Sequence, residues 1–153
     1  MEAMMADGRP AARVLCVDGE GRVLLLRWHD PVADRTFWEP PGGGIEPGET
    51  DLDAARRELW EETGLPGEAV EDLWTPVARD FHWLGVHYVK TERFYLARFD
   101  ATPPVASAAL TPGERGTYRG HAWHPRAALA ALPEPVEPPG LPRVLDVLLR
   151  GAS

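Results

Sequence analysis

The sequence predicts a single layered domain of the α/β (or α+β) class, and three observations support this expectation. The chain has 153 residues, which is the size of one domain. Hydrophobic residues make up 44% of it and charged residues 26%, as in an ordinary folded protein. Strand-like runs come first, one amphipathic helix follows, and strand-like runs return, which is typical of strands and helices packed in layers. Residues 1–10 are expected to be a flexible tail, and residues 11–153 the domain itself.

The first elements are predicted to be a hairpin and a glycine-rich loop. Residues 13–17 and 23–28 are apolar runs separated by Asp-Gly-Glu-Gly, a sequence that favours a β-hairpin. Phe37 and Trp38 then lead into Pro-Pro-Gly-Gly-Gly at residues 40–44. Such a loop must turn sharply or bring its backbone close to a ligand, because glycine adopts conformations that other residues avoid.

Residues 51–63 are predicted to form a helix. Thr50 is suited to the N-cap position, and Asp53, three residues on, to its reciprocal partner in a capping box. Gly64 provides a C-terminal stop. The apolar residues between these ends recur at helical spacing and define a buried stripe: Leu52, Ala55 and Leu59. Trp60 falls on the other flank of the stripe and is expected to pack against the domain.

The second half of the chain is expected to be rich in strands and to end in a helix. Val, Tyr and Phe are concentrated in its strand-like runs. Five prolines make residues 133–142 unsuitable for regular structure. In order, the expected elements are strands at 70–76, 77–83 and 86–99, a connection at 101–116, a strand at 118–123, a short helix at 126–132 and an amphipathic helix at 141–150.

Composition and charge exclude several classes of protein. Cys16 is the single cysteine, which excludes an intramolecular disulfide framework and a cysteine-based zinc site, and its apolar run predicts a core position. No apolar stretch approaches about 18 residues, and the N-terminus has no leader pattern, so we expect a cytoplasmic protein with no membrane partner. The formal net charge is −8, and the sequence shows no basic face for duplex nucleic acid.

The excess of acid is concentrated in one segment. Residues 42–65 contain seven Asp and Glu residues against two Arg, a local net charge of −5. Within the helix, Glu58, Glu61 and Glu62 share an arc of about 100° beside the buried stripe. Carboxylates this close repel each other unless a cation neutralises them, and their oxygens suit Mg²⁺ or Mn²⁺ rather than zinc. Because Mg²⁺ held by a few carboxylates is commonly completed by substrate phosphates, the residues indicate metal-assisted chemistry on a phosphate compound.

The spacing of glycine and glutamate in this segment matches a known signature. Gly43 is followed after five residues by Glu49, and after seven more by Arg-Glu-Leu-Trp-Glu-Glu-Thr-Gly-Leu, which begins at Arg57 and ends at Leu65. At every defined position this pattern resembles the Nudix box of the Nudix hydrolase superfamily, the MutT-like proteins. The resemblance is tight over residues 42–65 and implies the Nudix fold, in which a mixed β-sheet is sandwiched between α-helices.

The resemblance also implies which residues carry the chemistry. The implied reaction is attack of water on one phosphorus of a nucleoside diphosphate linked to another moiety, with Mg²⁺ or Mn²⁺ as the cofactor. Arg57 resembles the arginine that orients the glutamates, and the candidates for the general base are Glu58 and Glu92. The implied metal ligands are the backbone at Gly43 and the carboxylates of Glu49, Glu58, Glu61 and Glu62, the last three being counted among the catalytic residues.

Residues outside the box are expected to bind the substrate, a small nucleotide or another diphosphate. Trp38, Phe81 and Trp83 are candidates for stacking on a base, and Arg27 and Arg93 for contacts with phosphate. The sequence leaves open whether the substrate is a nucleoside triphosphate or an ADP-X compound. It also leaves open whether this chain forms a homodimer. The alternative function is a non-catalytic Nudix-like module that senses a nucleotide without hydrolysing it.

Overall fold

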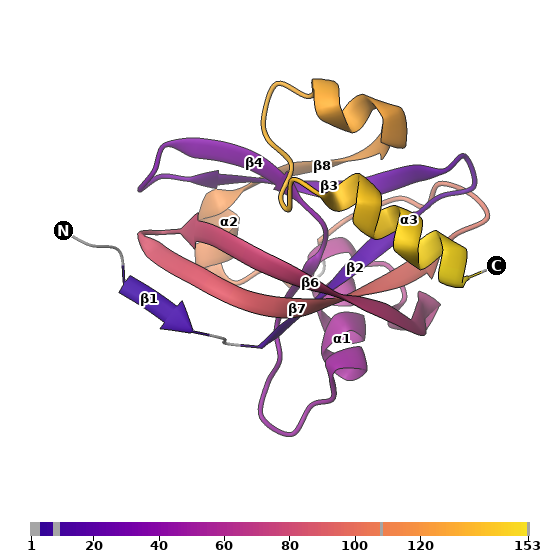
Figure 1. Cartoon of the computed structure of the whole chain (residues 1–153), viewed down its shortest axis with the longest axis horizontal. Coiled ribbons are helices and arrows are strands. Elements are labelled where there is room, and N and C mark those ends of the chain that lie inside the picture. Colours follow the sequence, from indigo (N-terminus) through magenta and orange to yellow (C-terminus); the bar gives the residue numbers. More distant parts are fainter. Residues whose placement is uncertain (1–3, 8–9, 108, 153) are drawn as a thin grey trace.

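One mixed β-sheet forms the centre of the protein (Figure 1). The structure, a computed structural model, describes residues 4–7, 10–107 and 109–152, with the backbone alone for 4–7. Eight strands lie within these residues: β1 (Met4–Asp7), β2 (Ala11–Val17), β3 (Arg22–Asp30), β4 (Arg35–Glu39), β5 (Gly42–Gly44), β6 (Val70–Trp83), β7 (Val86–Arg98) and β8 (Tyr118–Pro125). The helices are α1 (Asp51–Thr63), α2 (Pro112–Thr117) and α3 (Leu141–Gly151), with single 3₁₀ segments η1 (Gly67–Ala69) and η2 (Arg126–Ala131).

The strand order of the sheet is β1-β7-β2-β3-β4, with β5 paired to β2, β6 to β7 and β8 to β3. β7 runs parallel to both β1 and β2, and the other pairs are antiparallel. The sheet is therefore mixed, as the resemblance to the Nudix fold implies.

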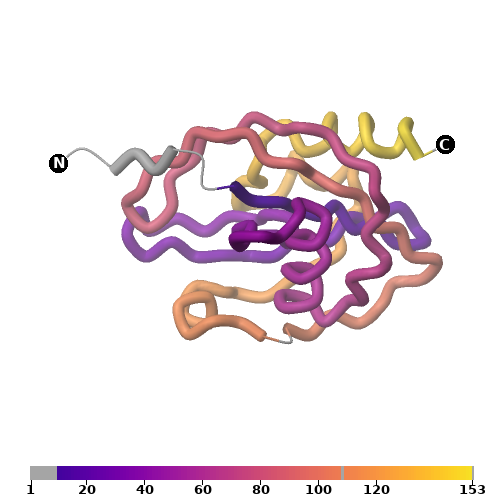
Figure 2. Tube along the Cα trace, turned by 90° about the horizontal axis from the view of Figure 1, so that it is seen from below, coloured from indigo at the N-terminus to yellow at the C-terminus, as the bar shows by residue number. Residues whose placement is uncertain are grey.

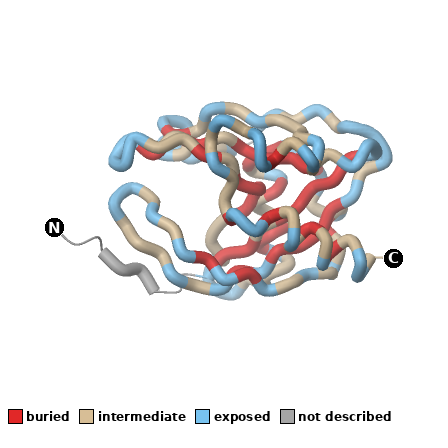
Figure 3. The backbone as a smooth tube through the Cα atoms, turned by 45° about the horizontal axis from the view of Figure 1, so that its top comes forward, coloured by how far each residue is buried: buried red, intermediate tan, exposed pale blue. Residues whose placement is uncertain are grey.

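Alternation along the strands divides the core into two layers, one on each face of the sheet. In β2, Cys16 points to the face that α1 covers and packs in a cluster with Leu59. The preceding residue, Leu15, points to the opposite face and packs with Leu145 of α3. All four side chains are 0–1% exposed. Figure 2 shows α1 and α3 on opposite sides of the strands, and Figure 3 shows the buried residues gathered along those strands. The prediction of helices on both faces of a sheet is confirmed.

The predicted helix at residues 51–63 has these bounds in the structure, because both of its ends carry the expected caps. The hydroxyl of Thr50 accepts a hydrogen bond from the backbone N–H of Asp53 at 3.1 Å. Gly64 adopts φ 72°, and its N–H donates to the carbonyl of Trp60 at 2.8 Å. The capping box predicted between Thr50 and Asp53 is only half formed, whereas a complete one occurs at the start of α2, between Thr111 and Glu114.

Trp60 is 51% exposed, so the expectation that it packs against the domain is wrong. The reason is the narrow buried stripe of α1, since Ala54, Ala55 and Leu59 already fill the contact with the sheet. Trp60 lies outside that stripe and on the solvent side of the helix.

Several other elements differ from the sequence-based expectation. The two strands expected at 70–76 and 77–83 are one strand, β6, whose register shifts between Val70 and Trp74. The triple glycine forms the short strand β5 rather than a loop, and the connection at 101–116 contains most of α2. Residues 4–7 of the expected tail pair with β7, while residues 1–3 and 8–9 lie outside the described residues. In the part of the chain that the structure describes, no helix is long and apolar enough to cross a membrane.

Candidate active site

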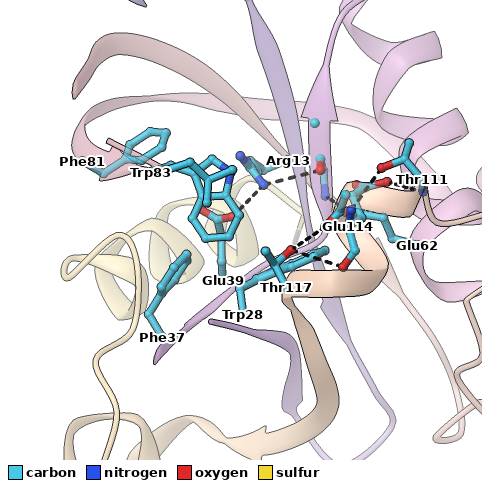
Figure 4. Close-up of a pocket in the computed structure, with 14 residues that line it drawn as sticks. Arg13, Trp28, Phe37, Glu39, Glu62, Phe81, Trp83, Thr111, Glu114 and Thr117 are labelled. Carbon is cyan, nitrogen blue, oxygen red and sulfur yellow. Dashed lines mark hydrogen bonds and ion pairs between the residues drawn. The ribbon is translucent and has the colours of Figure 1, made fainter. Parts of the chain in front are cut away.

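A cavity of about 380 Å³ lies over one end of the sheet and has two chemically different ends (Figure 4). One end is aromatic, with side chains from β3, β4 and β6: Trp28, Phe37, Phe81 and Trp83. The other end brings together β5 and the C-terminal half of α1, with Gly42, Gly43 and the carboxylate of Glu62. The remaining wall is formed by Arg13, Glu39, Leu84, Thr111, Gly113, Glu114 and Thr117. An aromatic surface and an acidic, glycine-lined surface thus face the same space.

Arg57 holds three of the four glutamates of the predicted metal site in place. Its Nε and Nη2 donate to the two carboxylate oxygens of Glu49 at 2.7 and 2.9 Å, a bidentate pair. Its Nη1 donates to Glu58 at 3.0 Å and to Glu61 at 3.1 Å. Nη2 also reaches the carbonyl of Gly44 at 2.9 Å, which ties α1 to β5. The hydrogen bonds from Arg57 lower the pKa of Glu49, which keeps this carboxylate charged.

Burial raises the pKa of two of the box carboxylates, those of Glu62 and Glu58. Glu62 is 4% exposed, and its Oε1 accepts a hydrogen bond from the N–H of Gly42 at 2.7 Å. Burial, followed by the nearby charge of Glu58, raises the pKa of Glu62 well above its ordinary value. Burial also raises the pKa of Glu58, although Arg57 opposes this shift. A buried carboxylate of raised pKa is a group whose ionised form requires a further cation.

The residues present fit a hard divalent cation in their chemistry. Carboxylate oxygens and backbone carbonyls are the donors that Mg²⁺ and Mn²⁺ prefer. A Cβ atom on Gly43 would lie 2.7 Å from an oxygen of Glu58, so only glycine allows this backbone to approach the carboxylate. Among the side chains that the structure describes, those of residues 10–107 and 109–152, no three Asp, Glu, His or Cys groups are already spaced to hold an ion. In this arrangement the carboxylates of Glu58 and Glu61 accept hydrogen bonds from the guanidinium of Arg57.

A buried network of charges underlies the cavity. Arg13 contacts Glu39 at 3.0 Å and Glu92 at 3.4 Å, and Arg79 bridges the same two carboxylates at 2.8 and 2.5 Å. Lys90 approaches the second oxygen of Glu92 at 3.1 Å. Burial alone would raise the pKa of Glu92, but these three cations outweigh it and hold the pKa at about 2.

Glu92 stays a prediction as the general base, and its surroundings weigh against that role. A carboxylate with a pKa of about 2 has little tendency to take a proton from water. Its side chain is fully buried and does not line the cavity. The geometry favours Glu92 as an anchor for Arg13 and Arg79 instead.

Phe81 and Trp83 line the cavity, whereas the other three residues predicted to bind substrate do not. Arg27 pairs with Glu134 at 2.5 Å, and Trp38 packs edge-on against His124. The register explains why, because Arg27 lies opposite Trp38 and the neighbouring pair is Trp28 and Phe37. Neighbouring pairs in a ladder point to opposite faces, so Arg27 and Trp38 face away from the aromatic end.

Arg93 also lies away from the cavity. Its guanidinium sits 3.9 Å from the ring centre of Trp74 and 3.4 Å from the carboxylate of Asp51. It follows Glu92 along β7, and successive side chains of a strand point to opposite faces. Since Glu92 faces the buried network, Arg93 faces outward.

Several cavity residues were not predicted from the sequence. Trp28 and Phe37 could have been found from strand alternation, because they occupy the opposite face to Arg27 and Trp38. Arg13 and Glu39 gave no local signal, since their pairing joins residues 26 apart in the chain. Glu114 belongs to the Thr-x-x-Glu capping signature of α2, which predicts a helix start but not its place beside the cavity.

The chain matches the NUDIX domain family over residues 7–146 and therefore belongs to the Nudix hydrolases. This membership confirms the resemblance that the box residues carry, and with it the enzyme class and the fold. Members of this family generally depend on divalent metal ions and act on small nucleotide-linked diphosphates.

Relatives and solved structures agree with the family. The RNA pyrophosphohydrolase of Cereibacter sphaeroides strain KD131 is 44% identical over 122 residues, covering 72% of this chain and 74% of the relative. That of Roseobacter denitrificans is 30% identical over 131 residues, covering 79% of each chain. Among solved structures, an Ap4A hydrolase of C. elegans has a TM-score of 0.68 at 22% identity, covering 94% of this chain and 99% of that one. The E. coli dihydroneopterin triphosphate pyrophosphohydrolase has a TM-score of 0.67 at 18% identity, covering 94% and 97%. At such identities the two structures show the common fold alone.

Proposed function

We propose that this Nudix hydrolase cleaves the P–O–P bridge of a small nucleotide. The observation that carries the proposal is that one cavity has both an aromatic end and an acidic, glycine-lined end. The aromatic rings offer flat apolar surfaces on which a base stacks. The acidic end would place the diphosphate beside the box glutamates. A nucleoside triphosphate or an ADP-X compound has both of these parts, and the cavity supports this class of substrate.

The box glutamates are the proposed ligands of Mg²⁺ or Mn²⁺. Glu58, Glu61 and Glu62 would supply carboxylate oxygens, Gly43 a backbone carbonyl, and Glu49 a further carboxylate. When bound, the ion supplies charge neutralisation at the diphosphate oxygens and a lowered pKa of water. Arg57 would keep Glu49, Glu58 and Glu61 oriented through the hydrogen bonds described above.

Glu58 is the proposed general base. Its carboxylate lies close to Gly43, which lines the cavity, and it pairs with Arg57, whereas Glu92 is buried among Arg13, Arg79 and Lys90. In the proposed step the oxygen of water forms a bond to one phosphorus while the bridging P–O bond breaks. The proton of the water passes to Glu58, and the bridging oxygen leaves with the bonding electrons on the departing phosphate.

An RNA is the second candidate substrate, because the two relatives above are both named RNA pyrophosphohydrolases. Among RNAs, one with a 5′ polyphosphate end contains the required P–O–P bridge. The formal net charge of −8 disfavours attraction of a long polyanion and supports the small nucleotide instead.

A hydrolysis screen with identification of the products tests the proposal. Nucleoside triphosphates, ADP-ribose, dinucleoside polyphosphates and a 5′-triphosphorylated RNA are incubated with the protein in Mg²⁺. We expect cleavage of a small nucleotide at its P–O–P bridge into two phosphorylated products, and we expect this cleavage to stop on chelation. Glu62→Gln should lower kcat at least about 100-fold while the circular dichroism spectrum is unchanged. Tight binding of a nucleotide without hydrolysis, for all substrates and metals, would instead support the sensing module.

A further inference from the structure

Two hairpin tips meet at the aromatic end of the cavity. β3 and β4 are joined by a turn at residues 31–34, and β6 and β7 by Leu84 and Gly85. Figures 1 and 2 show the ends of both hairpins on the same side of the molecule. Each hairpin supplies aromatic side chains to the cavity, so the distance between the tips decides how far apart its walls lie.

A single buried carboxylate, that of Asp30, joins the two tips. Asp30 is 2% exposed. Its Oδ1 accepts hydrogen bonds from the N–H groups of Val32 at 2.9 Å and Ala33 at 3.3 Å within its own turn. Its Oδ2 accepts one from the N–H of Leu84, at 3.1 Å, on the other tip. Both oxygens are therefore used, and each serves a different hairpin.

The second tip is strained at the residue that Asp30 contacts. Leu84 has φ 51° and Gly85 φ 82°, the pair of positive angles that a two-residue type I′ turn requires. Asn or Gly usually occupies the first of these positions, and a bulky residue there is an outlier. Strained backbone persists only where its surroundings fix it, and the bond from Leu84 to Asp30 is such a constraint.

The constrained tip carries a wall of the cavity. Trp83, directly before Leu84, lies edge-on to Trp28 and Phe37, with ring centres 6.4 and 5.7 Å apart. Leu84 lines the same cavity and is 44% exposed at its rim. Trp28 and Phe37 belong to the other hairpin, so this aromatic cluster is formed only when the tips are held together.

We propose that Asp30 is a specificity-determining positioning residue, which sets the aromatic cavity's affinity for the base by holding the β6–β7 tip against the β3–β4 tip. The proposal rests on the function proposed above, because it takes the aromatic end as the site of the base. Asp30 itself touches no substrate. Its effect acts through Leu84 and Trp83 and falls on binding of the base rather than on the diphosphate.

Asp30→Asn is the sharpest test, because it keeps the volume of the side chain and removes one acceptor. An amide has a single acceptor oxygen, so one tip must face an NH₂ group in place of an oxygen. Asp18→Asn is the matched control. Asp18 is 4% exposed and accepts the N–H groups of Glu20 and Arg22 in the β2–β3 turn, but does not line the cavity.

Isothermal titration calorimetry in Mg²⁺ measures binding of two probes, a nucleoside monophosphate and inorganic pyrophosphate. The nucleoside monophosphate used as the probe is whichever of AMP, GMP, CMP and UMP binds most tightly to the wild-type protein. We expect Asp30→Asn to raise its Kd about 5- to 10-fold and to leave that of pyrophosphate within about twofold. Asp18→Asn should leave both Kd values within about twofold. Gly85→Ala, which strains the tip at φ 82° without touching Asp30, should shift the monophosphate Kd in the same direction.

An unchanged Kd for the monophosphate in Asp30→Asn would overturn the proposal. Equal weakening of monophosphate and pyrophosphate by Asp30→Asn would overturn it as well, since that pattern indicates general loss of structure. Absence of monophosphate binding by the wild type would also contradict it. Failure of the proposed function has a different signature, namely no hydrolysis in the screen while the monophosphate still binds.

Discussion

Arg57 connects most of the residues of the predicted metal site through its hydrogen bonds. Its five hydrogen bonds reach Glu49 twice, Glu58, Glu61 and the backbone of Gly44. The planar guanidinium makes this possible, because its donors point in several fixed directions within one plane. A lysine would preserve the charge and lose the bidentate contact.

We therefore expect Arg57→Lys to lower kcat/KM about 10- to 100-fold, because the glutamates lose their orientation. The concentration of Mg²⁺ needed for half-maximal rate should rise in parallel, and steady-state kinetics over a Mg²⁺ series measures both. Arg98→Lys is the control, since Arg98 makes a bidentate pair with Glu71 at 2.9 and 3.0 Å on the exposed surface. Wild-type kinetics in Arg57→Lys would contradict an orienting role.

Glu92 differs from the box glutamates because its charge is already balanced. Its folded pKa of about 2 lies below its ordinary value of 4.5, so the unfolded chain binds the proton more tightly. The stability that Glu92 contributes is thus present above about pH 4.5 and is lost as pH falls toward about 2. Glu92→Gln should destabilise the fold at pH 7 by about 3–5 kcal/mol, because Arg13 and Arg79 lose one of the two carboxylates that they share.

Urea denaturation of wild type and Glu92→Gln from pH 2 to 7 measures this difference in the free energy of unfolding. The difference should shrink as the pH falls below about 4.5. Turnover per folded molecule at pH 7 then separates anchoring from base catalysis. A stable Glu92→Gln variant with kcat reduced more than about 100-fold would contradict the anchoring role and indicate a base.

At the scale of elements, the junction of β5 with α1 is the tightest part of the predicted metal site. The backbone of Gly43 lies so close to Glu58 that a Cβ would sit 2.7 Å from the carboxylate. We expect Gly43→Ala to displace Glu58 and to lower kcat at least about 10-fold, with a small change in melting temperature. Gly116→Ala is the control, since nothing lies within 4 Å of its added Cβ. Equal activity of the two variants would show that the close approach has no catalytic role.

At the scale of the whole molecule, local signals in the sequence predicted more than long-range ones. The bounds of α1 followed from Thr50 and Gly64, because caps are local features of the chain. The box glutamates followed from spacing along that one helix. The cavity walls did not follow, since Trp28, Phe37 and Trp83 are brought together by the register of two hairpins. Sequence alternation shows which residues share a face, but not which hairpins meet.

The same limit explains the residues predicted to bind substrate. Arg27 and Arg93 were chosen because they are basic. The cavity residue next to Arg27 is Trp28, and the neighbour of Arg93, Glu92, faces the buried network of charges. A shift of one residue along a strand reverses the face of a side chain. Register likewise explains why Phe37, which was not predicted, lines the cavity and the predicted Trp38 does not.

Stability and metal binding should be coupled across the whole domain through Glu62. Its pKa is raised in the folded state, so without a cation the folded protein loses stability as pH rises through that pKa. A divalent ion that binds only the folded state adds about 2.7 kcal/mol at 100 times its Kd. For a domain of this size the wild-type melting temperature should rise about 5–10 °C with saturating Mg²⁺ at pH 7.5.

Glu62→Gln should melt at or above the wild-type temperature in chelator, because the substitution removes a buried charge. The melting temperature of this variant should rise little on addition of Mg²⁺. Differential scanning fluorimetry with chelator and with Mg²⁺ measures both effects, with the exposed Glu68→Gln as the control that behaves like wild type. If Mg²⁺ stabilised Glu62→Gln as much as wild type, Glu62 would not be a ligand, and the metal would bind elsewhere.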